Sequence, residues 1–398
     1  MNFEKAISTP IISSAAFSYS TCKEAEDIFS GNSNKPLYSR MGNPTTTILE
    51  NKLAKMDNAI ACIATSSGMG AISMSIMSLC SNGDEIIAIG GLFGGSYALL
   101  SQTLVRFGIK TTFLDANDVD KIKKYITDNT KLIYCESVGN PNLRLLNIKK
   151  IANIANVEGI AFMVDNTSTP LIVKPIDLGA DICVYSTTKV ISGNSSALGG
   201  ASVFKAIQEG GKFYSKRYKF MKPFLDKLGA KALYGINKKR ALRDFGMSAN
   251  ANASYQTLLG LETLELRNQR INSSCEIISQ ALDDYSITIN HPSLKSNIDN
   301  KLYKEYYPNG CGSVITIDMK TKQKAFKFLD SSKLLTLTAN IGDSRTLGLH
   351  MASTIFSDFT QEEKNFLGIS EGLIRLSIGL ENPYDVIDDL INCYNLSK

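Results

Sequence analysis

Short apolar runs recur through the first half of the chain and are separated by longer stretches with a different pattern. Each run spans four to six residues, which is typical of buried strands. In the stretches between them, such as Ala71–Leu79 and Ile148–Ala155, apolar residues return every three or four positions, as in helices. Strands that alternate with helices predict an α/β layer with a mostly parallel sheet. The runs are 59–64, 85–89, 111–114, 132–135, 160–164, 182–185 and 201–204.

The second half of the chain has another rhythm. A charged segment, Lys205–Arg243, is followed by a long helical pattern over Ser254–Ser274. Beyond it, two alternating segments predict half-buried strands and two more segments predict helices. These are 314–318 and 374–378 for the strands, and 322–329 and 386–394 for the helices. We therefore expect an N-terminal arm over residues 1–55, a large α/β domain over 56–250 and a smaller α+β domain over 251–398.

Composition and charge exclude several functional classes. Of the 398 residues, 43% are hydrophobic and 20% are charged, the balance of an ordinary soluble globular protein. The net charge of +5 is mild for this length and implies no acidic partner. The basic stretch Lys205–Arg243 is interleaved with Phe220, Phe224 and Leu228, which favours a solvated helical face over a nucleic-acid surface. We predict no nucleic-acid role.

Targeting and metal-binding signals are weak. The segment Met1–Ala6 lacks the apolar core of a signal peptide, and no run of about 18 apolar residues exists to cross a membrane. The eight cysteines are scattered without a CxxC pair, and only His291 and His350 could serve as imidazole ligands. We expect a cytoplasmic protein with reduced thiols, no metal and no membrane partner.

One carboxylate and one amine stand at the ends of two predicted strands. Asp165 follows the run 160–164, and Lys189 lies 24 positions later, after Ser186 and Thr188. Neighbouring strand ends meet in one crevice. This pairing suits pyridoxal 5'-phosphate (PLP), which needs a lysine amine for its Schiff base and a carboxylate near its pyridine nitrogen, while the two hydroxyls could bind its phosphate. By itself, a lysine after a strand is more often a solvated surface residue.

Five sequence blocks resemble, in order, the signature blocks of the Cys/Met-metabolism PLP enzymes. They are Tyr38–Thr45, Ser67–Ala71, Glu136–Pro141, Ser186–Lys189 and Arg375–Gly379. The resemblance extends from about residue 10 to 395. The family includes cystathionine synthases and lyases, methionine gamma-lyase and O-acetylhomoserine sulfhydrylase. It implies a fold-type-I, aspartate aminotransferase-like architecture. Such an architecture has a mostly parallel seven-stranded sheet in the large domain and a smaller α+β C-terminal domain.

The resemblance also implies roles at the cofactor phosphate. Gly68 and Met69 would bind it at a helix N-terminus, where backbone N–H groups face outward; an ordinary glycine-containing helix start is the alternative. Tyr38 and Arg40, which by themselves could be an exposed pair, would reach the phosphate of a neighbouring subunit. The expected assembly is a homotetramer of two dimers that share active sites. The run Gly90–Gly95 does not fit GxGxxG, so no dinucleotide site is predicted.

Substrate contacts and catalysis follow from the same resemblance. Arg375 and Asn340 would bind the amino-acid substrate, although an arginine in a strand usually points to solvent. Asn140, otherwise a turn residue, would lie near the phenolic oxygen of the cofactor. Lys189 would move the α-proton. Phe93 stands where most relatives have a tyrosine that stacks on the ring and assists proton transfer; stacking would survive, and the hydroxyl would not.

Other departures leave the substrate open. Asn194 stands where relatives usually have histidine, and Asn250–Ala253 replaces a Ser-Pro-containing segment. The blocks Gly260–Leu264 and Ala339–Asp343 resemble the sulfhydrylase branch, which acts in transsulfuration and methionine biosynthesis. We expect PLP-dependent γ-replacement on O-acetyl-L-homoserine with sulfide or a small thiol. The alternatives are methionine gamma-lyase-like or cystathionine-type C–S chemistry, and a PLP-binding homologue with little activity.

Overall fold

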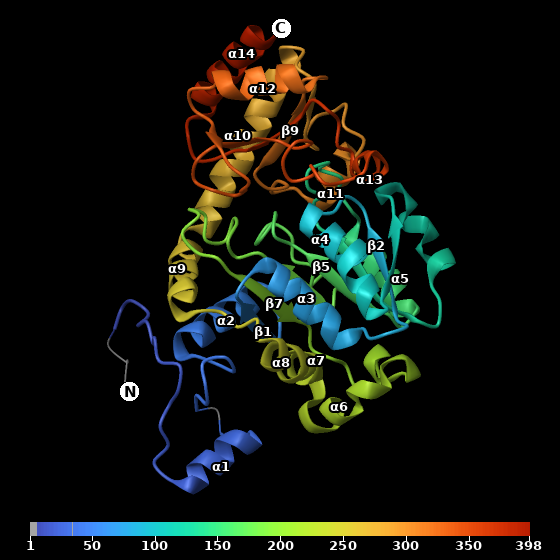
Figure 1. Cartoon of the computed structure of the whole chain (residues 1–398), viewed down its shortest axis with the longest axis vertical. Helices are drawn as coiled ribbons and strands as arrows, with labels where there is room; N and C mark the ends of the chain where they lie inside the picture. The colour runs from blue at the N-terminus through green and yellow to red at the C-terminus, as the bar shows by residue number, and fades with distance from the viewer. Residues whose placement is uncertain (1–5, 34) are drawn as a thin grey trace.

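The computed structural model describes residues 6–33 and 35–398, which form two β-sheets flanked by helices (Figure 1). The large sheet has the strand order β1-β7-β6-β5-β4-β2-β3, and the small sheet has the order β10-β11-β12-β9-β8. The large-sheet strands are β1 (Ala61–Thr65), β2 (Glu85–Ile89), β3 (Lys110–Leu114), β4 (Thr130–Glu136), β5 (Ala161–Asp165), β6 (Ile182–Tyr185) and β7 (Gly200–Phe204). The small-sheet strands are β8 (Ile289–Asn290), β9 (Val314–Asp318), β10 (Thr336–Leu337), β11 (Leu347–His350) and β12 (Leu373–Ser377).

Helices cover both sheets and connect them. The N-terminal part has α1 (Cys22–Ser30) and α2 (Pro44–Met56). The large layer has α3 (Gly68–Leu79), α4 (Gly94–Ala98), α5 (Ile148–Val157), α6 (Lys222–Leu228), α7 (Ala232–Ile236) and α8 (Arg243–Phe245). The remaining helices are α9 (Ala251–Leu261), α10 (Leu264–Asp284), α11 (Asn300–Tyr306), α12 (Lys322–Ser331), α13 (Gln361–Leu367) and α14 (Pro383–Ser397). None of the described helices is long and apolar enough to cross a membrane.

The large sheet confirms the predicted fold class. Strand β2 pairs in parallel with β3 and β4, β4 with β5, and β5 with β6, whereas β7 runs antiparallel to its neighbours β6 and β1. Each strand overlaps an apolar run of the sequence. Both faces of the central strands are covered by helices, so nearly every residue along them is buried and apolar.

Two hydrophobic cores lie on opposite faces of the large sheet. Along β2, Ile86 packs on the side of α3, and Ile87 packs on the side of α5, because successive strand residues point to opposite faces. The helices contribute apolar side chains to these two cores. They are Ile72 and Met74 on α3, and Ile148 and Ile151 on α5. The carboxyl ends of β4, β5 and β6 are thereby fixed side by side.

The small sheet has a core of its own. Ile315 and Ile317 of β9 pack with Ile374 and Leu376 of β12, beneath α10, α12 and α14. Strand β12 lies in the middle of this sheet, between β9 and β11. In Figure 1 this layer lies above the large sheet, and α10 runs up into it.

The helical pattern over Ser254–Ser274 is interrupted, contrary to the sequence expectation of one long helix. Helix α9 ends at Leu261 and α10 begins at Leu264. The Gly260 carbonyl accepts a hydrogen bond of 2.7 Å from Arg267 Nη2, and this contact competes with continuation of the helical ladder. A Cβ on Gly260 would also lie 2.5 Å from the Ile191 carbonyl oxygen, so α9 is pressed against the loop that follows Lys189.

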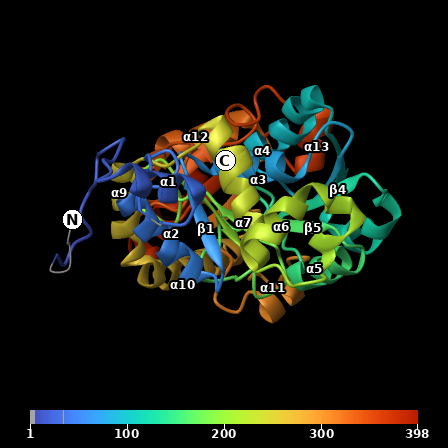
Figure 2. The same cartoon turned by 90° about the horizontal axis from the view of Figure 1, so that it is seen from below.

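Helix α1 lies at the edge of the molecule. Figure 1 shows α1 below the body formed by the two sheets, and in Figure 2 the described residues before α1 extend to the left of α9. An isolated bridge joins Ala16 to Tyr38, and the arm then enters α2, whose N-terminus is capped by the Asn43 side chain. Tyr38 is 44% exposed in the single chain.

Candidate active site

A cavity of about 320 Å³ opens where the carboxyl ends of β4, β5 and β6 meet the small sheet. This is the edge at which parallel sheets bind ligands. The large layer contributes Asp165, Lys189 and the start of α3, and the small layer contributes Arg375 and Asn340. Of the residues singled out in the sequence, the following line it: Gly68, Met69, Phe93, Asn140, Asp165, Ser186, Thr188, Lys189, Asn340 and Arg375.

The N-terminus of α3 meets the loop after β6 at one wall of the cavity. Ser67 caps the helix by accepting a hydrogen bond of 3.0 Å from the Gly70 N–H. The first N–H groups of a helix have no partners within it and carry partial positive charge. A Cβ on Gly68 would lie 2.6 Å from the Ser186 Cβ, so only glycine allows this approach. The wall therefore combines backbone N–H groups with the Ser186 hydroxyl, which suits a phosphate.

Lys189 lies in the loop that begins directly after β6. Its Nζ donates a hydrogen bond of 2.5 Å to Asn340 Oδ1. Burial, with a smaller contribution from the positive charge of Arg375, lowers the pKa of Lys189 to about 8. A sizeable fraction of the amine is therefore neutral near pH 8 and able to act as a nucleophile or a base. Thr188, the residue before it, uses its hydroxyl to bond the Gly199 carbonyl at 3.1 Å.

Two carboxyl groups end neighbouring strands in the cavity. Asp165 ends β5 and accepts a hydrogen bond of 3.0 Å from the Thr167 N–H, while burial raises its pKa to about 6. Glu136 ends β4 and accepts a hydrogen bond of 2.6 Å from the Phe93 N–H. Burial first, and then the Asp165 charge, raises the pKa of Glu136 well above its ordinary value. Glu136 begins one of the five sequence blocks, but the sequence pattern assigns it no role.

Arg375 projects from β12 and is 3% exposed. Its Nη1 donates to Asn140 Oδ1 at 3.2 Å, and its Nη2 donates to the Asn340 carbonyl oxygen at 3.3 Å. Both acceptors are neutral, and burial lowers the pKa of the guanidinium to about 10. A buried cation whose acceptors are neutral is well suited to a carboxylate ligand. It does not point to solvent, which was the alternative in the sequence.

Phe93 lies at the turn before α4 and lines the cavity. A Cβ on Gly95 would lie 2.6 Å from its ring, and Met69 borders the same space. The cavity wall, within the described residues, contains no tyrosine, histidine or cysteine side chain. The side-chain acids and bases in this cavity are therefore Lys189, Asp165 and Glu136, together with the guanidinium of Arg375.

Tyr38 and Arg40 do not reach the cavity of their own chain. The Arg40 guanidinium lies 5.5 Å from the centre of the Tyr38 ring and donates a hydrogen bond of 2.9 Å to the Arg243 carbonyl. Both residues lie on the arm next to Asn250 and Ala251, on another surface of the molecule.

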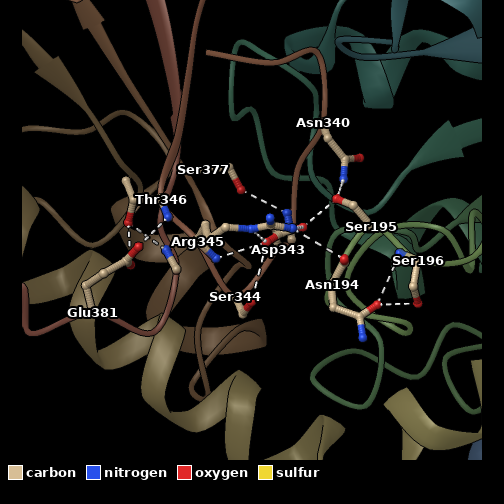
Figure 3. A network of polar contacts seen from close by, with 12 residues as sticks. Asn194, Ser195, Ser196, Asn340, Asp343, Ser344, Arg345, Thr346, Ser377 and Glu381 are labelled. Carbon is tan, nitrogen blue, oxygen red and sulfur yellow. Dashed lines mark hydrogen bonds and ion pairs between the residues drawn. The ribbon is translucent and has the colours of Figure 1, made fainter. Parts of the chain in front are cut away.

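A polar network missed by sequence reasoning borders the cavity (Figure 3). Asn340 donates from Nδ2 to Ser195 Oγ at 2.8 Å, and the Ser195 hydroxyl bonds Asp343 in turn. Arg345 donates to both Asp343 oxygens, from Nε at 2.8 Å and from Nη2 at 3.1 Å. Asn194 joins only through its carbonyl oxygen, which accepts from Arg345 at 3.4 Å. Local sequence patterns give little indication of this network, because Ser195 and Asp343 lie in loops 148 positions apart.

The groups around this cavity match the chemical needs of pyridoxal phosphate. A partly neutral amine, a carboxyl at a strand end and the N–H groups of the α3 N-terminus beside Ser186 face one space, and the fold places them at a strand-end crevice. Fold and site together define a PLP-dependent enzyme.

The chain belongs to the Cys/Met metabolism PLP-dependent enzyme family, whose model matches residues 2–395. A homocysteine synthase of Schizosaccharomyces pombe is 34% identical over 96% of this chain and 92% of its own. An O-acetyl-L-homoserine sulfhydrylase of Leptospira meyeri is 33% identical over 96% and 90%, and an L-methionine gamma-lyase of Treponema denticola is 33% identical over 97% and 91%. These relatives are PLP-dependent transferases and C–S lyases, as the sequence predicted.

A solved structure has the same fold over almost the whole chain. It is a Campylobacter jejuni protein assigned to O-acetylhomoserine (thiol)-lyase, with a TM-score of 0.94 and 32% identity, and it covers 99% of this chain and 96% of its own. That protein carries a pyridoxyl-lysine phosphate group. The predicted fold class and cofactor are thereby confirmed, while the relatives include both replacement and elimination enzymes.

Proposed function

We propose that the chain catalyses γ-replacement on O-acetyl-L-homoserine, in which sulfide or a small thiol displaces acetate to give homocysteine or a thioether amino acid. The observation that carries this proposal is Phe93, an aromatic ring without a hydroxyl, in a cavity whose described wall contains no tyrosine, histidine or cysteine. Within this wall only Lys189 and the carboxyl groups could protonate a departing thiolate, and the ring at position 93 offers no proton for it.

The roles of the side chains follow from their positions. PLP supplies an aldehyde that condenses with an amine and a protonated ring that withdraws electrons. We assign Lys189 Nζ to the cofactor and to transfer of the α-proton, because burial keeps the pKa of this amine near 8. Asp165 would face the ring nitrogen, and the α3 N-terminus with Ser186 would hold the phosphate. Thr188, already bonded to Gly199, would support this wall of the site.

The substrate would bind between the two sheets. Arg375 would hold the α-carboxylate with Asn340 beside it, and Asn140 would lie between this guanidinium and the cofactor. Phe93 and Met69 would pack against the cofactor. A carboxyl group, with an ordinary pKa near 4, leaves without acid assistance more readily than a thiol, with a pKa near 8.5. Departure of acetate from an acetyl ester therefore requires less acid assistance from this cavity than departure of a thiolate from a thioether.

We also infer that each site is completed by a second copy of the chain. Tyr38 and Arg40 lie away from the cavity of their own chain, next to Arg243 and the residues at the start of α9. An arginine with an adjacent tyrosine suits a phosphate. In the proposed dimer these two side chains would reach the partner's cofactor phosphate, and two such dimers would form a tetramer.

Product analysis tests the proposed reaction. The purified, PLP-loaded enzyme is given O-acetyl-L-homoserine plus sulfide, or methionine alone, and homocysteine and 2-oxobutanoate are quantified. We expect homocysteine from the first mixture at a higher kcat/KM than 2-oxobutanoate from the second. A Lys189→Ala variant should lose both activities and the Schiff-base absorbance. A preference for methionine would replace this proposal with a γ-lyase.

A further inference from the structure

Ser195 has an unusual backbone conformation close to the candidate cofactor lysine. Its φ of 58° lies in the left-handed region, which non-glycine residues rarely adopt because it is strained for them. It lies six positions after Lys189, in the loop between β6 and β7. Surrounding contacts must hold it there, and two hydrogen bonds of its own hydroxyl are available to do so.

The acid end of the network fixes the direction of these hydrogen bonds. Asp343 is 1% exposed, and its pKa is lowered because hydrogen bonds from Arg345 and Ser195 outweigh its desolvation. An ionised carboxylate only accepts hydrogen bonds, so the Ser195 hydroxyl must donate to Asp343. The lone pairs of Ser195 Oγ are then left to accept from a donor on the other side.

The other side of Ser195 is Asn340. Its Nδ2 is the group that donates to Ser195 Oγ, at 2.8 Å. The amide is thereby held with Oδ1 on the opposite side, where it accepts the 2.5 Å hydrogen bond from Lys189 Nζ. If the amide were turned over, its NH₂ group would face the ammonium of Lys189 and no acceptor would remain there. Figure 3 shows Asn340, Ser195 and Asp343 in this sequence.

We propose that Ser195 is a positioning residue that fixes the orientation of the Asn340 amide between Asp343 and Lys189, so that Asn340 Oδ1 holds the lysine amine in the cavity. The inference rests on the assignment of Lys189 as the cofactor lysine. It goes beyond that assignment because Ser195 lies outside the cavity wall and acts only through Asn340. Loss of its hydroxyl would free the amide to rotate.

The neighbouring residue offers a matched control. Ser196 is exposed, and its hydroxyl bonds the Asn194 Oδ1 at 2.6 Å, outside the path from Asp343 to Lys189. The charged side chains around the amine are Arg375 from β12 and the carboxyls of Asp165 and Glu136 from β5 and β4. All of them are unchanged in variants of either serine.

The test measures the Lys189 amine directly, in the full chain before PLP is added. The protein is labelled briefly with acetic anhydride across pH 6 to 10, and acetylation of Lys189 is quantified by peptide mass spectrometry. A hydrogen bond from Nζ to an amide oxygen favours the charged amine. Ser195→Ala should therefore lower the labelling midpoint and increase Lys189 acetylation below it by about threefold. Ser196→Ala should label like the unmodified chain.

A second variant separates the hydroxyl from the backbone. Ser195→Gly also lacks the hydroxyl but accommodates the left-handed conformation without strain. The proposal requires the same change in labelling from Ser195→Gly as from Ser195→Ala. It is overturned if Ser195→Gly matches the unmodified chain, which would leave only a backbone effect, or if neither variant changes the labelling. Failure of the cofactor assignment would show separately, as a Lys189→Ala protein that keeps its Schiff-base absorbance.

Discussion

Glu136 and Asp165 are register partners at the ends of the adjacent parallel strands β4 and β5, and both carboxyl groups line one cavity. Two neighbouring negative charges repel each other, so one carboxyl takes up a proton before the other as the pH falls. The pKa of Glu136 is raised well above its ordinary value, whereas that of Asp165 reaches only about 6. As the pH falls, Glu136 therefore takes up a proton before Asp165, and Asp165 keeps its negative charge longer.

This division of charge predicts opposite results for two isosteric substitutions. Glu136→Gln imitates the neutral acid and retains an acceptor for the Phe93 N–H, so PLP binding should change little. Asp165→Asn removes the charge assigned to the ring nitrogen and should lower turnover on the order of a hundredfold. Turnover and the cofactor retained after gel filtration are measured for both. A larger loss from Glu136→Gln than from Asp165→Asn would reverse the assignment.

Gly68 predicts a steric effect on cofactor binding. In Gly68→Ala the added Cβ would meet Ser186 at 2.6 Å and widen the gap between α3 and the loop after β6. We expect PLP affinity to fall by about tenfold or more, which corresponds to about 1.4 kcal/mol, with the fold retained. Equilibrium titration with PLP measures the change, and Ser73→Ala in the same helix is the control. Unchanged affinity would argue against a phosphate at this wall.

The arm predicts complementation between two inactive proteins. Lys189→Ala and Arg40→Ala, mixed under conditions of subunit exchange, should recover part of the activity, because a hybrid dimer has one site with both residues intact. Lys189→Ala mixed with the double variant Lys189→Ala/Arg40→Ala should recover none. Subunit exchange is verified by native mass spectrometry. Exchange without recovery would contradict a site shared between subunits.

Phe93 predicts a change in reaction preference. Phe93→Tyr places a hydroxyl where a proton donor is missing, and general acid catalysis contributes about a hundredfold or more when well placed. We expect kcat/KM for methionine cleavage to rise at least about tenfold more than that for O-acetyl-L-homoserine with sulfide. Phe93→Leu, which removes the ring, should lower both. An equal effect of Phe93→Tyr on both reactions would mean that another group supplies the proton.

A buried carboxyl outside the cavity lining predicts how stability depends on pH. Asp57 is fully buried, and its Oδ2 accepts a hydrogen bond of 2.7 Å from the Tyr185 hydroxyl. Burial raises its pKa from 3.8 to about 7. Because the folded state binds this proton more tightly than the unfolded state, the stabilisation is complete below pH 3.8 and is lost as the pH rises to 7.

Asp57→Asn should therefore gain stability relative to the unmodified protein between pH 5 and pH 7, on the order of 2 kcal/mol. Urea unfolding of both proteins at the two pH values measures the difference, in which the contributions of other carboxyls such as Glu50 cancel. Asp226→Asn, at an exposed ion pair, is the control. A constant difference across this range would show that Asp57 is ionised in the folded protein.

Local sequence patterns predicted the strands and helices of the fold well. They could not predict contacts between segments that are distant in the sequence. Strand β2 was expected at its observed bounds because its burial on both faces gives a continuous apolar run. The break before α10 was missed because its cause, Arg267, acts through a carbonyl seven positions away and through the loop after Lys189. Arg375 was predicted by resemblance, but its hydrogen bond to Asn140, 235 positions away, could not be predicted from a local pattern.

The two halves of the candidate site belong to separate hydrophobic cores. Lys189 and Asp165 follow strands of the large sheet, whereas Arg375 is carried by β12 in the middle of the small one. Substitutions in the core around Ile374 and Leu376 can shift the guanidinium while the crevice of the large sheet keeps its shape. The small-sheet core is therefore expected to set the position of Arg375 directly, and to reach the candidate cofactor lysine only through Asn340.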